Sequence, residues 1–316
     1  KVVEAVQAVL HEQADALRLY PDPDATALKQ AIAKQQNIDV SQVFVGNGSD
    51  EVLAHIFKAF FLQDEPILYP DITYSFYPVY SQFFGTKTKE IPLNENFEID
   101  VRDYTQPNGG VIITNPNAPT SIALGLSAIE EVLQANPNSV VVIDEAYVDF
   151  GAESAVSLVE KYENLVVCQT TSKSRSLAGL RVGFAIAQPH LIAALEAVKN
   201  SFNSYPMDRF AIAAAVASFE DQAYFEAQNA KVIASREKLT TQLKELRFKV
   251  LPSAANFIFA SFPSKDAGEL ASELREHGII VRYFNKPRIN QFLRITIGTD
   301  EQSQRLIDTL KNEILI

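Results

Sequence analysis

Short runs of apolar and β-branched residues alternate with segments of helical periodicity along most of this 316-residue chain. The runs include QVFVG (42–46), VIIT (111–114) and VVVID (140–144), and each is followed by polar residues. Parallel strands need long crossovers, and helices usually supply them, so this alternation is typical of a mostly parallel sheet flanked by helices. We therefore predict an α/β fold. The other runs that the same pattern assigns to this sheet are PILYP (66–70), LVVCQT (165–170) and VGFAIA (182–187).

Helical periodicity fills most of the gaps between these runs. The clearest case is SDEVLAHIFKAFF (49–61), in which every apolar side chain of one stripe recurs at three- or four-residue spacing. That stripe consists of Val52, Leu53, Ile56, Phe57 and Phe60. Further helices are predicted over residues 2–17, 26–36, 75–84 and 127–135.

The pattern changes after residue 205. A helical region over about 207–246, interrupted near 220, precedes a strand, a helix, two strands and a final helix. The final helix opens with Thr299 and Gln302 in the spacing of a capping box. We predict a large α/β domain over 21–205 and a smaller α+β domain made of 1–20 and 206–316, which includes the connecting helix. The segments between connector and final helix are NFIFASF (256–262), AGELASELREHG (267–278), IIVRYF (279–284) and FLRITIG (292–298).

Composition narrows the functional classes. The net charge is −11 at pH 7, whereas a surface that binds nucleic acid or an anionic membrane needs a basic face. The single cysteine, Cys168, lies in an apolar run and the four histidines are far apart, so we predict neither disulfides nor a metal site. No apolar run approaches the roughly 20 residues of a membrane span, and no signal-peptide pattern is present. These observations predict a cytoplasmic protein without nucleic-acid or membrane partners.

In open α/β sheets, ligands bind beyond the carboxyl ends of the strands. The run VFV leads into GNGSDE, whose glycines and helix start could hold an anion at Ser49 and Asp50. A plain strand-to-helix turn with Ser49 as N-cap explains the same residues. After ILYP, Tyr74 could offer a flat face to an aromatic ligand, although packing is the commoner role of a tyrosine near a strand end.

Three further strand ends carry polar groups. VIIT leads into NPNAPT, a rigid turn that presents amide side chains or serves only as a turn. Asp144 directly follows an apolar run, so its carboxylate is either a site group or a helix cap. LVVC leads into QTTSKSRSLAGLR, where Thr170, Ser172 and Arg181 could bind a phosphate beside Lys173.

Together these strand ends describe one pocket with an anion cradle, an aromatic face, an acid, a phenol at Tyr147 and a lysine. Pyridoxal phosphate needs all of them. Its aldehyde forms a Schiff base with a lysine, its ring nitrogen pairs with a carboxylate and its phosphate needs a cradle. We therefore predict this cofactor, with Lys173 as the Schiff-base lysine and Arg181 as the phosphate anchor.

The sequence also resembles the fold-type-I pyridoxal-phosphate-dependent aminotransferases over essentially its whole length. Within that superfamily it is most similar to the histidinol-phosphate aminotransferase family, while threonine-phosphate decarboxylases and aromatic aminotransferases share much of the pattern. The segments that carry the resemblance are RLYPDPDATALKQAIA (18–33), GNGSDE (46–51), NPNAPT (115–120), VVIDEAY (141–147), TTSKSRSLAGLRVG (170–183), GIIVRYF (278–284) and FLRITIGT (292–299).

The resemblance implies a role for each matched residue of the cofactor site. Lys173 holds the cofactor and moves a proton, while Asp144 keeps the ring nitrogen protonated. Tyr147 donates a hydrogen bond to the phenolic oxygen of the ring, and Tyr74 stacks on the ring. The residues expected to hold the phosphate are Ser49, Asp50, Thr170, Ser172 and Arg181.

Three other residues extend the expected site. Tyr20 matches a tyrosine that, in the family, crosses the dimer interface to the neighbour's cofactor phosphate, which implies a homodimer with shared active sites. Arg294, inside FLRITIG, matches the arginine that binds the anionic group of the substrate, and Arg282 is expected to help it. An arginine inside an apolar strand is itself unusual, although an exposed edge strand would also explain it.

The sequence departs from the family pattern in two places. The family turn carries asparagine immediately before Pro-Thr-Gly, whereas Ala118 stands there in this chain and Ser121 replaces the glycine. We predict that Asn117 donates to the cofactor oxygen instead, and that Asn115 braces the turn. Family members also carry an N-terminal arm with an Asn-Glu-Asn-Pro segment that would precede Lys1. Part of the substrate lid and of the dimer contact is therefore expected to be missing from this sequence.

The resemblance implies an enzyme that moves an amino group between L-histidinol phosphate and 2-oxoglutarate, the keto acid of glutamate, in histidine biosynthesis. An aminotransferase for aromatic or other amino acids, or a phosphoamino-acid decarboxylase of the same fold, stays open as an alternative. A non-catalytic regulator that senses a ligand is a more distant alternative, since no basic DNA-binding segment accompanies the domain.

Overall fold

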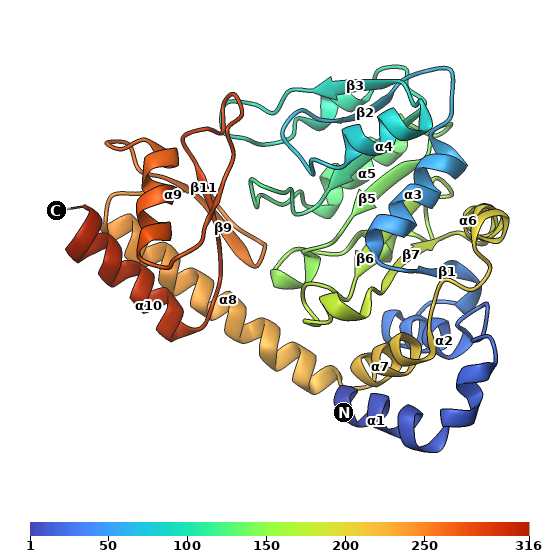
Figure 1. Cartoon of the computed structure of the whole chain (residues 1–316). Helices are drawn as coiled ribbons and strands as arrows, with labels where there is room; N and C mark the ends of the chain where they lie inside the picture. Colours follow the sequence, from blue (N-terminus) through green and yellow to red (C-terminus); the bar gives the residue numbers. More distant parts are fainter. Residues whose placement is uncertain (316) are drawn as a thin grey trace.

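The computed structural model describes residues 1–315 and shows two regions, each built around its own sheet (Figure 1). The larger sheet has seven strands in the order β1-β7-β6-β5-β4-β2-β3. Neighbours pair in parallel except around β7, which runs antiparallel to both β1 and β6. The predicted mostly parallel α/β sheet is therefore confirmed. Its strands are β1 (Val43–Gly46), β2 (Ile67–Pro70), β3 (Thr88–Ile91), β4 (Gly110–Thr114), β5 (Val141–Asp144), β6 (Leu165–Thr170) and β7 (Gly183–Ala187).

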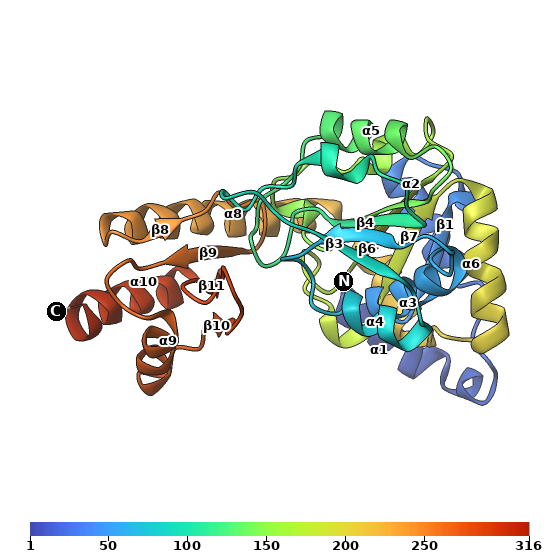
Figure 2. The same ribbon diagram turned by 90° about the horizontal axis from the view of Figure 1, so that it is seen from above.

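Helices cover both faces of this sheet (Figure 2). Alternate residues of β5 divide between two cores: Val141 and Ile143 face one core, and Val142 faces the other. Burial on both faces explains why such strands are continuous apolar runs. The first core is shared with α2 (Thr26–Gln36), α5 (Leu126–Ala135) and α7 (Arg209–Phe219), and the second with α3 (Ser49–Phe60), α4 (Tyr77–Phe84) and α6 (Pro189–Phe202).

The first helix and the start of the connecting helical region lie in a different region from the one that the domain prediction gave them. α1 (Val2–Glu12) packs on α7, and Ala211, Ala215 and Phe219 of α7 belong to a core of the large sheet. Both helices therefore lie with the large sheet rather than with the small one, because their apolar faces are covered there. The helix predicted over 2–17 also ends early, at Glu12, and is followed by a 3-10 helix (Ala14–Arg18).

The smaller region is an antiparallel sheet of four strands in the order β10-β11-β9-β8. Leu243 of the connecting helix shares one core with Ile258 and Leu293 of the sheet. The capping box predicted at Thr299 and Gln302 is confirmed at the start of the last α-helix. The elements are α8 (Gln222–Glu245), β8 (Lys249–Val250), β9 (Phe257–Ser261), α9 (Ala267–Glu276), β10 (Arg282–Tyr283), β11 (Leu293–Thr296) and α10 (Asp300–Thr309).

Three elements differ from the prediction. β3 is an edge strand whose residues 88–90 are exposed, so no apolar run indicates it. No element was predicted for α6, although Leu191, Ile192 and Leu195 bury one helical stripe. The run 279–284 forms only the two-residue strand β10, because the backbone N–H of its first residue bonds back to Leu274 O and completes the end of α9.

Among residues 1–315, no helix is both long enough and apolar enough to cross a membrane. Within the same residues, no group of three histidine, cysteine, aspartate or glutamate side chains is arranged to hold a metal ion.

Candidate active site

The predicted site residues meet beyond the carboxyl edge of the large sheet. β4 and β5 end side by side, with Thr114 and Asp144 paired in register, and β6 ends at Thr170 before the loop that carries Lys173. A cavity of about 150 Å³ opens at this edge. The predicted residues that line it are Ser49, Asp50, Tyr74, Asp144, Tyr147, Thr170, Ser172, Lys173 and Arg181.

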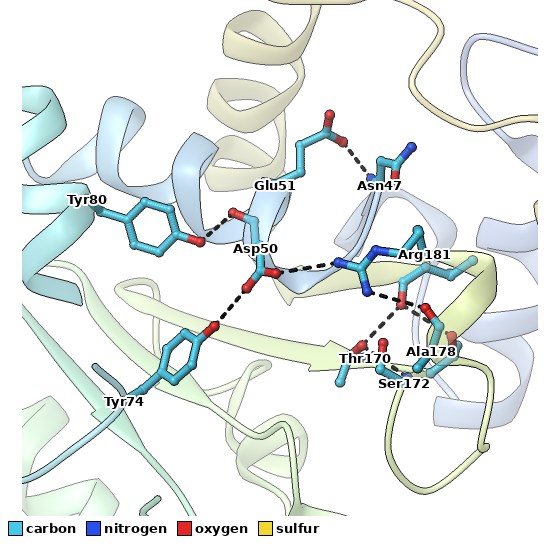
Figure 3. A network of polar contacts seen from close by, with 11 residues as sticks. Asn47, Asp50, Glu51, Tyr74, Tyr80, Thr170, Ser172, Ala178 and Arg181 are labelled. Carbon is cyan, nitrogen blue, oxygen red and sulfur yellow. Dashed lines mark hydrogen bonds and ion pairs between the residues drawn. The ribbon is translucent and has the colours of Figure 1, made fainter. Parts of the chain in front are cut away.

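One end of the cavity is formed by the start of α3 and by Arg181 (Figure 3). Ser49 is the first helical residue and makes no side-chain capping bond, so the alternative of a simple N-cap does not hold. Gly48 precedes it with φ +84°, and a Cβ there would lie 2.5 Å from Arg181 Nη2. Glycine therefore lets the loop approach the guanidinium closely. A helix start leaves its first N–H groups without intrahelical acceptors, so this end presents both backbone donors and a guanidinium to an anion.

Arg181 and Asp50 form a loose pair at this end. Nη2 of Arg181 lies 3.4 Å from Asp50 Oδ2, and both side chains are about half exposed, at 46% and 52%. An exposed pair at this distance is weak, so the guanidinium stays available to a ligand. The other oxygen, Oδ1, accepts a hydrogen bond from Tyr74 OH at 3.0 Å. The Asp50 carboxylate thus orients its two neighbours, and its backbone N–H is the part that suits a phosphate.

The opposite end of the cavity is Asp144, whose side chain is buried. Oδ2 accepts a hydrogen bond from Tyr77 OH at 2.8 Å, and Oδ1 accepts the Ala146 N–H at 3.3 Å. Burial raises the pKa of Asp144 to about 6, against the lowering by the Tyr77 bond. The residue caps no helix, since the next 3-10 helix has Tyr147 as its N-cap. A carboxyl whose desolvation is only partly compensated favours a cationic partner.

Three hydroxyl groups beside Asp144 were not predicted. Tyr77 is fully buried, and its OH lies 2.7 Å from Thr114 Oγ1, which lies 3.1 Å from Thr73 Oγ1. The sequence carries a signal for one of them, because Thr114 ends a strand run that directly precedes the run ending in Asp144.

Lys173 lines the same cavity, in the loop after β6. Burial, and next the positive charge of Arg294, lower the pKa of Lys173, while Asp50 and Asp144 act in the opposite direction. A lowered pKa increases the fraction of neutral amine, which is the form that acts as nucleophile and base. Nζ lies 5.5 Å from the centroid of the Tyr147 ring. Burial raises the pKa of Tyr147, which keeps its phenol protonated and able to donate.

Asn117 does not line the cavity, so this geometry does not favour the predicted donation to the cofactor. Its Nδ2 donates to Ile72 O at 2.9 Å and to Thr120 Oγ1 at 3.0 Å, and its Oδ1 accepts from Thr73 Oγ1 at 2.9 Å. Both amide hydrogens are therefore engaged inside the protein. The turn directs this side chain toward the segment after β2 and away from the cavity.

The other residues of this turn have separate roles. Ala118 lines the cavity, so the position of the family's asparagine is occupied here by a methyl group. Asn115 bonds to both the N–H and the carbonyl of Leu124, which confirms that it braces the turn. Ser121 has φ +66° and thus keeps the left-handed backbone that the family's glycine would adopt easily.

A larger cavity of about 730 Å³ opens beside the first, and Tyr147 and Lys173 are among the residues that line both. Arg282 on β10 and Arg294 on β11 line it and stand directly opposite each other in the antiparallel register. Like charges in this arrangement are destabilising. Among residues 1–315 neither arginine pairs with a carboxylate, and Arg294 Nε is buried without an acceptor. This pair is therefore suited to the anionic group of a ligand.

Tyr20 lines neither of these cavities. Its side chain is 77% exposed and stacks on Tyr205 with ring centroids 4.6 Å apart. Its carbonyl accepts a hydrogen bond from Arg209 Nη2 at 2.8 Å. Because Tyr20 lies away from both cavities of its own chain, the predicted contact with a cofactor phosphate would require a second copy.

The sheet edge therefore offers a ligand an amine of lowered pKa, placed in one cavity with a buried carboxyl group and an anion cradle. On a sheet of this topology, that arrangement defines a pyridoxal-phosphate-dependent transferase of fold type I. The family model described as aminotransferase class I and II matches residues 1–310, and the chain belongs to that family.

Individual relatives show which aminotransferases this chain resembles. The chain is 88% identical over 315 residues to the histidinol-phosphate aminotransferase of Acinetobacter baumannii (strain SDF), and the match covers 100% of this chain and 87% of that protein. It is 60% identical to the histidinol-phosphate aminotransferase of Pseudomonas putida, with 97% and 88% covered. The crystal structure of histidinol-phosphate aminotransferase from Sinorhizobium meliloti in complex with pyridoxal-5'-phosphate has a TM-score of 0.88 at 24% identity, with 99% and 86% covered. This last likeness confirms the fold.

Proposed function

We propose that this chain is a histidinol-phosphate aminotransferase that uses pyridoxal phosphate to transfer an amino group between L-histidinol phosphate and 2-oxoglutarate. It would act in histidine biosynthesis in the cytoplasm. Curated relatives of that name are 88% and 60% identical over nearly the whole chain. The observation that carries the proposal is that Arg282 and Arg294 stand opposite each other beside Lys173 and that neither has a carboxylate partner among residues 1–315. Both substrates bring an anionic group, a phosphate in one and a carboxylate in the other, and the pair can bind either.

The residues of the smaller cavity fit pyridoxal phosphate. The start of α3 and Arg181 offer the donors that its phosphate needs, and the hydroxyl groups of Thr170 and Ser172 line the same cavity. Asp144, buried at the other end, would hold the protonated ring nitrogen, and Tyr74 would lie against the ring. When bound, the cofactor supplies the electron sink for the charge that develops at the substrate Cα.

The chain itself supplies binding and proton transfer. Lys173, whose pKa is lowered, would bind the cofactor through Nζ and would then carry the proton between the substrate Cα and the cofactor carbon C4′. Tyr147 would donate its phenolic hydrogen to the ring oxygen. Arg294, with Arg282, would hold the anionic end of the substrate and so orient the amino group toward Lys173.

We also propose a homodimer with shared active sites. Tyr20 is exposed and would reach the phosphate only in a second copy. Phe83 on α4 and Phe202 on α6 are 79% and 82% exposed, and both helices pack on α3, which starts at the phosphate end. Aromatic side chains left open on neighbouring helices are typical of a surface covered by a partner.

The test is a half-reaction with purified protein loaded with pyridoxal phosphate. L-histidinol phosphate, glutamate, phenylalanine and threonine phosphate are added separately, and the visible absorbance band of the bound cofactor is followed. We expect histidinol phosphate and glutamate to remove the band, and 2-oxoglutarate to restore it. If histidinol phosphate leaves the band unchanged while another amine removes it, the substrate assignment is wrong.

Lys173→Ala provides the matched variant for this assay. It should fold like the unchanged chain, lose the visible band and lose transamination, because no other amine lines the smaller cavity. Turnover near the unchanged rate would refute the role of Lys173 and with it the proposed function.

A further inference from the structure

A chain of side-chain contacts leads away from the carboxyl group of Asp144 into the interior. Asp144 Oδ2 contacts Tyr77 OH at 2.8 Å, which contacts Thr114 Oγ1 at 2.7 Å. Thr114 Oγ1 contacts Thr73 Oγ1 at 3.1 Å, and Thr73 Oγ1 contacts Asn117 Oδ1 at 2.9 Å. Tyr77, Thr114 and Asn117 are buried, so these groups depend on one another for hydrogen bonds.

The far end of this chain can only accept. Asn117 Nδ2 uses its two hydrogens on Ile72 O and Thr120 Oγ1, which fixes Oδ1 as the atom that faces Thr73. An amide oxygen has no hydrogen to give. Every hydrogen in the four contacts must therefore come from the three hydroxyl groups or from Asp144 itself.

The number of hydrogens depends on the charge of Asp144. When Asp144 is ionised, the three hydroxyl hydrogens must serve four contacts, so Tyr77 donates to Oδ2 and one contact further along lacks a hydrogen. When Asp144 is protonated, it donates to Tyr77, Tyr77 donates to Thr114, Thr114 to Thr73 and Thr73 to Asn117. All four contacts are then hydrogen bonds.

We propose that Tyr77, Thr114 and Thr73 form a hydroxyl relay that positions Asp144. The hydrogen bonds of this relay reverse their donor-to-acceptor direction when Asp144 gains or loses its proton. In the ionised state Oδ2 takes the Tyr77 hydrogen. Oδ1, whose protein donor is the Ala146 N–H at 3.3 Å, then stays open to a protonated ring nitrogen. The relay rests on the proposed function only for this use of Oδ1, since the hydrogen count holds for the protein alone.

Other ionisable groups also act on Asp144 and belong to any account of its titration. Asp50 raises the pKa of Asp144 and Lys173 lowers it, after the larger effects of burial and of the Tyr77 bond. These two charges are unchanged by substitutions within the relay, so variants can be compared directly. The charge of Asp144 in turn raises the pKa values of Tyr74, Tyr80, Tyr147 and Cys168.

Two single substitutions separate the relay from a simple structural contact, because they move the pKa of Asp144 in opposite directions. Tyr77→Phe removes the donor of the ionised carboxylate, so the pKa rises. Thr114→Val leaves Tyr77 in place but removes the group that accepts its hydrogen when Asp144 is protonated. A buried hydroxyl hydrogen without an acceptor disfavours the protonated state, so the pKa falls by about one pH unit. Thr114→Ser restores the acceptor and returns the pKa toward its starting value.

The measurement is the infrared carbonyl band of the protonated Asp144 carboxyl in the full chain freed of cofactor, followed against pH. Subtraction of the Asp144→Asn spectrum assigns the band and removes the contribution of Glu145. We expect a higher midpoint in Tyr77→Phe, a lower one in Thr114→Val and a restored one in Thr114→Ser. An unchanged or raised midpoint in Thr114→Val overturns the relay. Since no substrate is present, this result is independent of whether histidinol phosphate is the amino donor.

Discussion

Gly183 is the position where one methyl group most directly disturbs the phosphate end of the site. It begins β7, between Gly46 of β1 and Thr170 of β6 in the sheet. A Cβ at Gly183 would lie 2.2 Å from the backbone nitrogen of Ser49 and 2.4 Å from the carbonyl carbon of Gly48. Both atoms belong to the start of α3, whose first N–H groups would face the phosphate in the proposed site. The backbone fixes the position of a Cβ, so no side-chain rotation can relieve its contact with these backbone atoms.

The size of the effect follows from this overlap. Ordinary contact begins at 3.4 Å, so β7 and the start of α3 must separate by about 1 Å in Gly183→Ala. Overpacking of this kind costs about 1–3 kcal/mol of folding stability. The same displacement lengthens at least one charge-assisted hydrogen bond to the phosphate, worth about 1.5–3 kcal/mol. A tenfold change in affinity corresponds to about 1.4 kcal/mol, so we expect pyridoxal phosphate to bind at least about 10-fold more weakly.

The assay is the dissociation constant of pyridoxal phosphate, measured together with denaturant unfolding of the cofactor-free chain. Gly179→Ala is the matched control, because it lies in the same β6–β7 connection and its Cβ would meet nothing within 4 Å. We expect the control to bind like the unchanged chain. If Gly183→Ala also binds the cofactor like the control, the close approach of β7 to α3 does not shape the phosphate site, and the reasoning fails.

Three further predictions concern single residues. Asp144→Asn should retain the cofactor but raise the activation free energy of the half-reaction by at least about 3 kcal/mol, since an amide cannot stabilise a cationic ring nitrogen. An unchanged rate would show that Asp144 plays no such part. Burial raises the pKa of Glu145 from 4.5 to about 7, so the folded cofactor-free chain binds this proton more tightly than the unfolded chain. Glu145 therefore contributes its full stabilisation to the folded chain below about pH 4.5, and this stabilisation is lost as pH rises through 7. Glu145→Gln should flatten the resulting fall in the free energy of unfolding, measured against pH. Tyr20→Phe should weaken cofactor binding by roughly 1–2 kcal/mol, yet in mixed dimers with Lys173→Ala chains the only lysine-bearing site should keep its full affinity. A weakened affinity at that site would place Tyr20 in its own chain's site.

The large sheet was predictable because its strands are buried on both faces. In β5 and β6 every residue is buried, so each strand is a short apolar run that stands out from its neighbours. β3 follows a different rule, since an edge strand with an exposed face needs no apolar run. The placement of α1 and α7 also escaped prediction. Their apolar stripes indicate burial but not which of two cores provides it.

The meeting of the site residues at one edge of the sheet was predictable for a related reason. Parallel strands bring their carboxyl ends to one edge, so residues after separate runs become neighbours without any knowledge of the loops. The orientation of Asn117 had no such rule, because the direction of a side chain in a turn depends on backbone geometry that spacing does not fix. Tyr77 was missed because one more aromatic residue at the start of a helix carries no mark of its partner. That partner, Asp144, lies 67 positions away.

Arg294 connects the two cavities electrostatically. In the structure its charge is the second-largest cause, after burial, of the lowered pKa of Lys173. A substrate phosphate or carboxylate paired with Arg294 would offset that charge, and the proton affinity of Lys173 would then rise. The lysine would thus be most easily neutral before the substrate binds, when it has to act as a nucleophile. It would become the better proton acceptor once an anionic substrate lies beside it. Because the coupling needs only a charge at Arg294, either anionic substrate would produce it, which suits a site that has to process two different amino donors in turn.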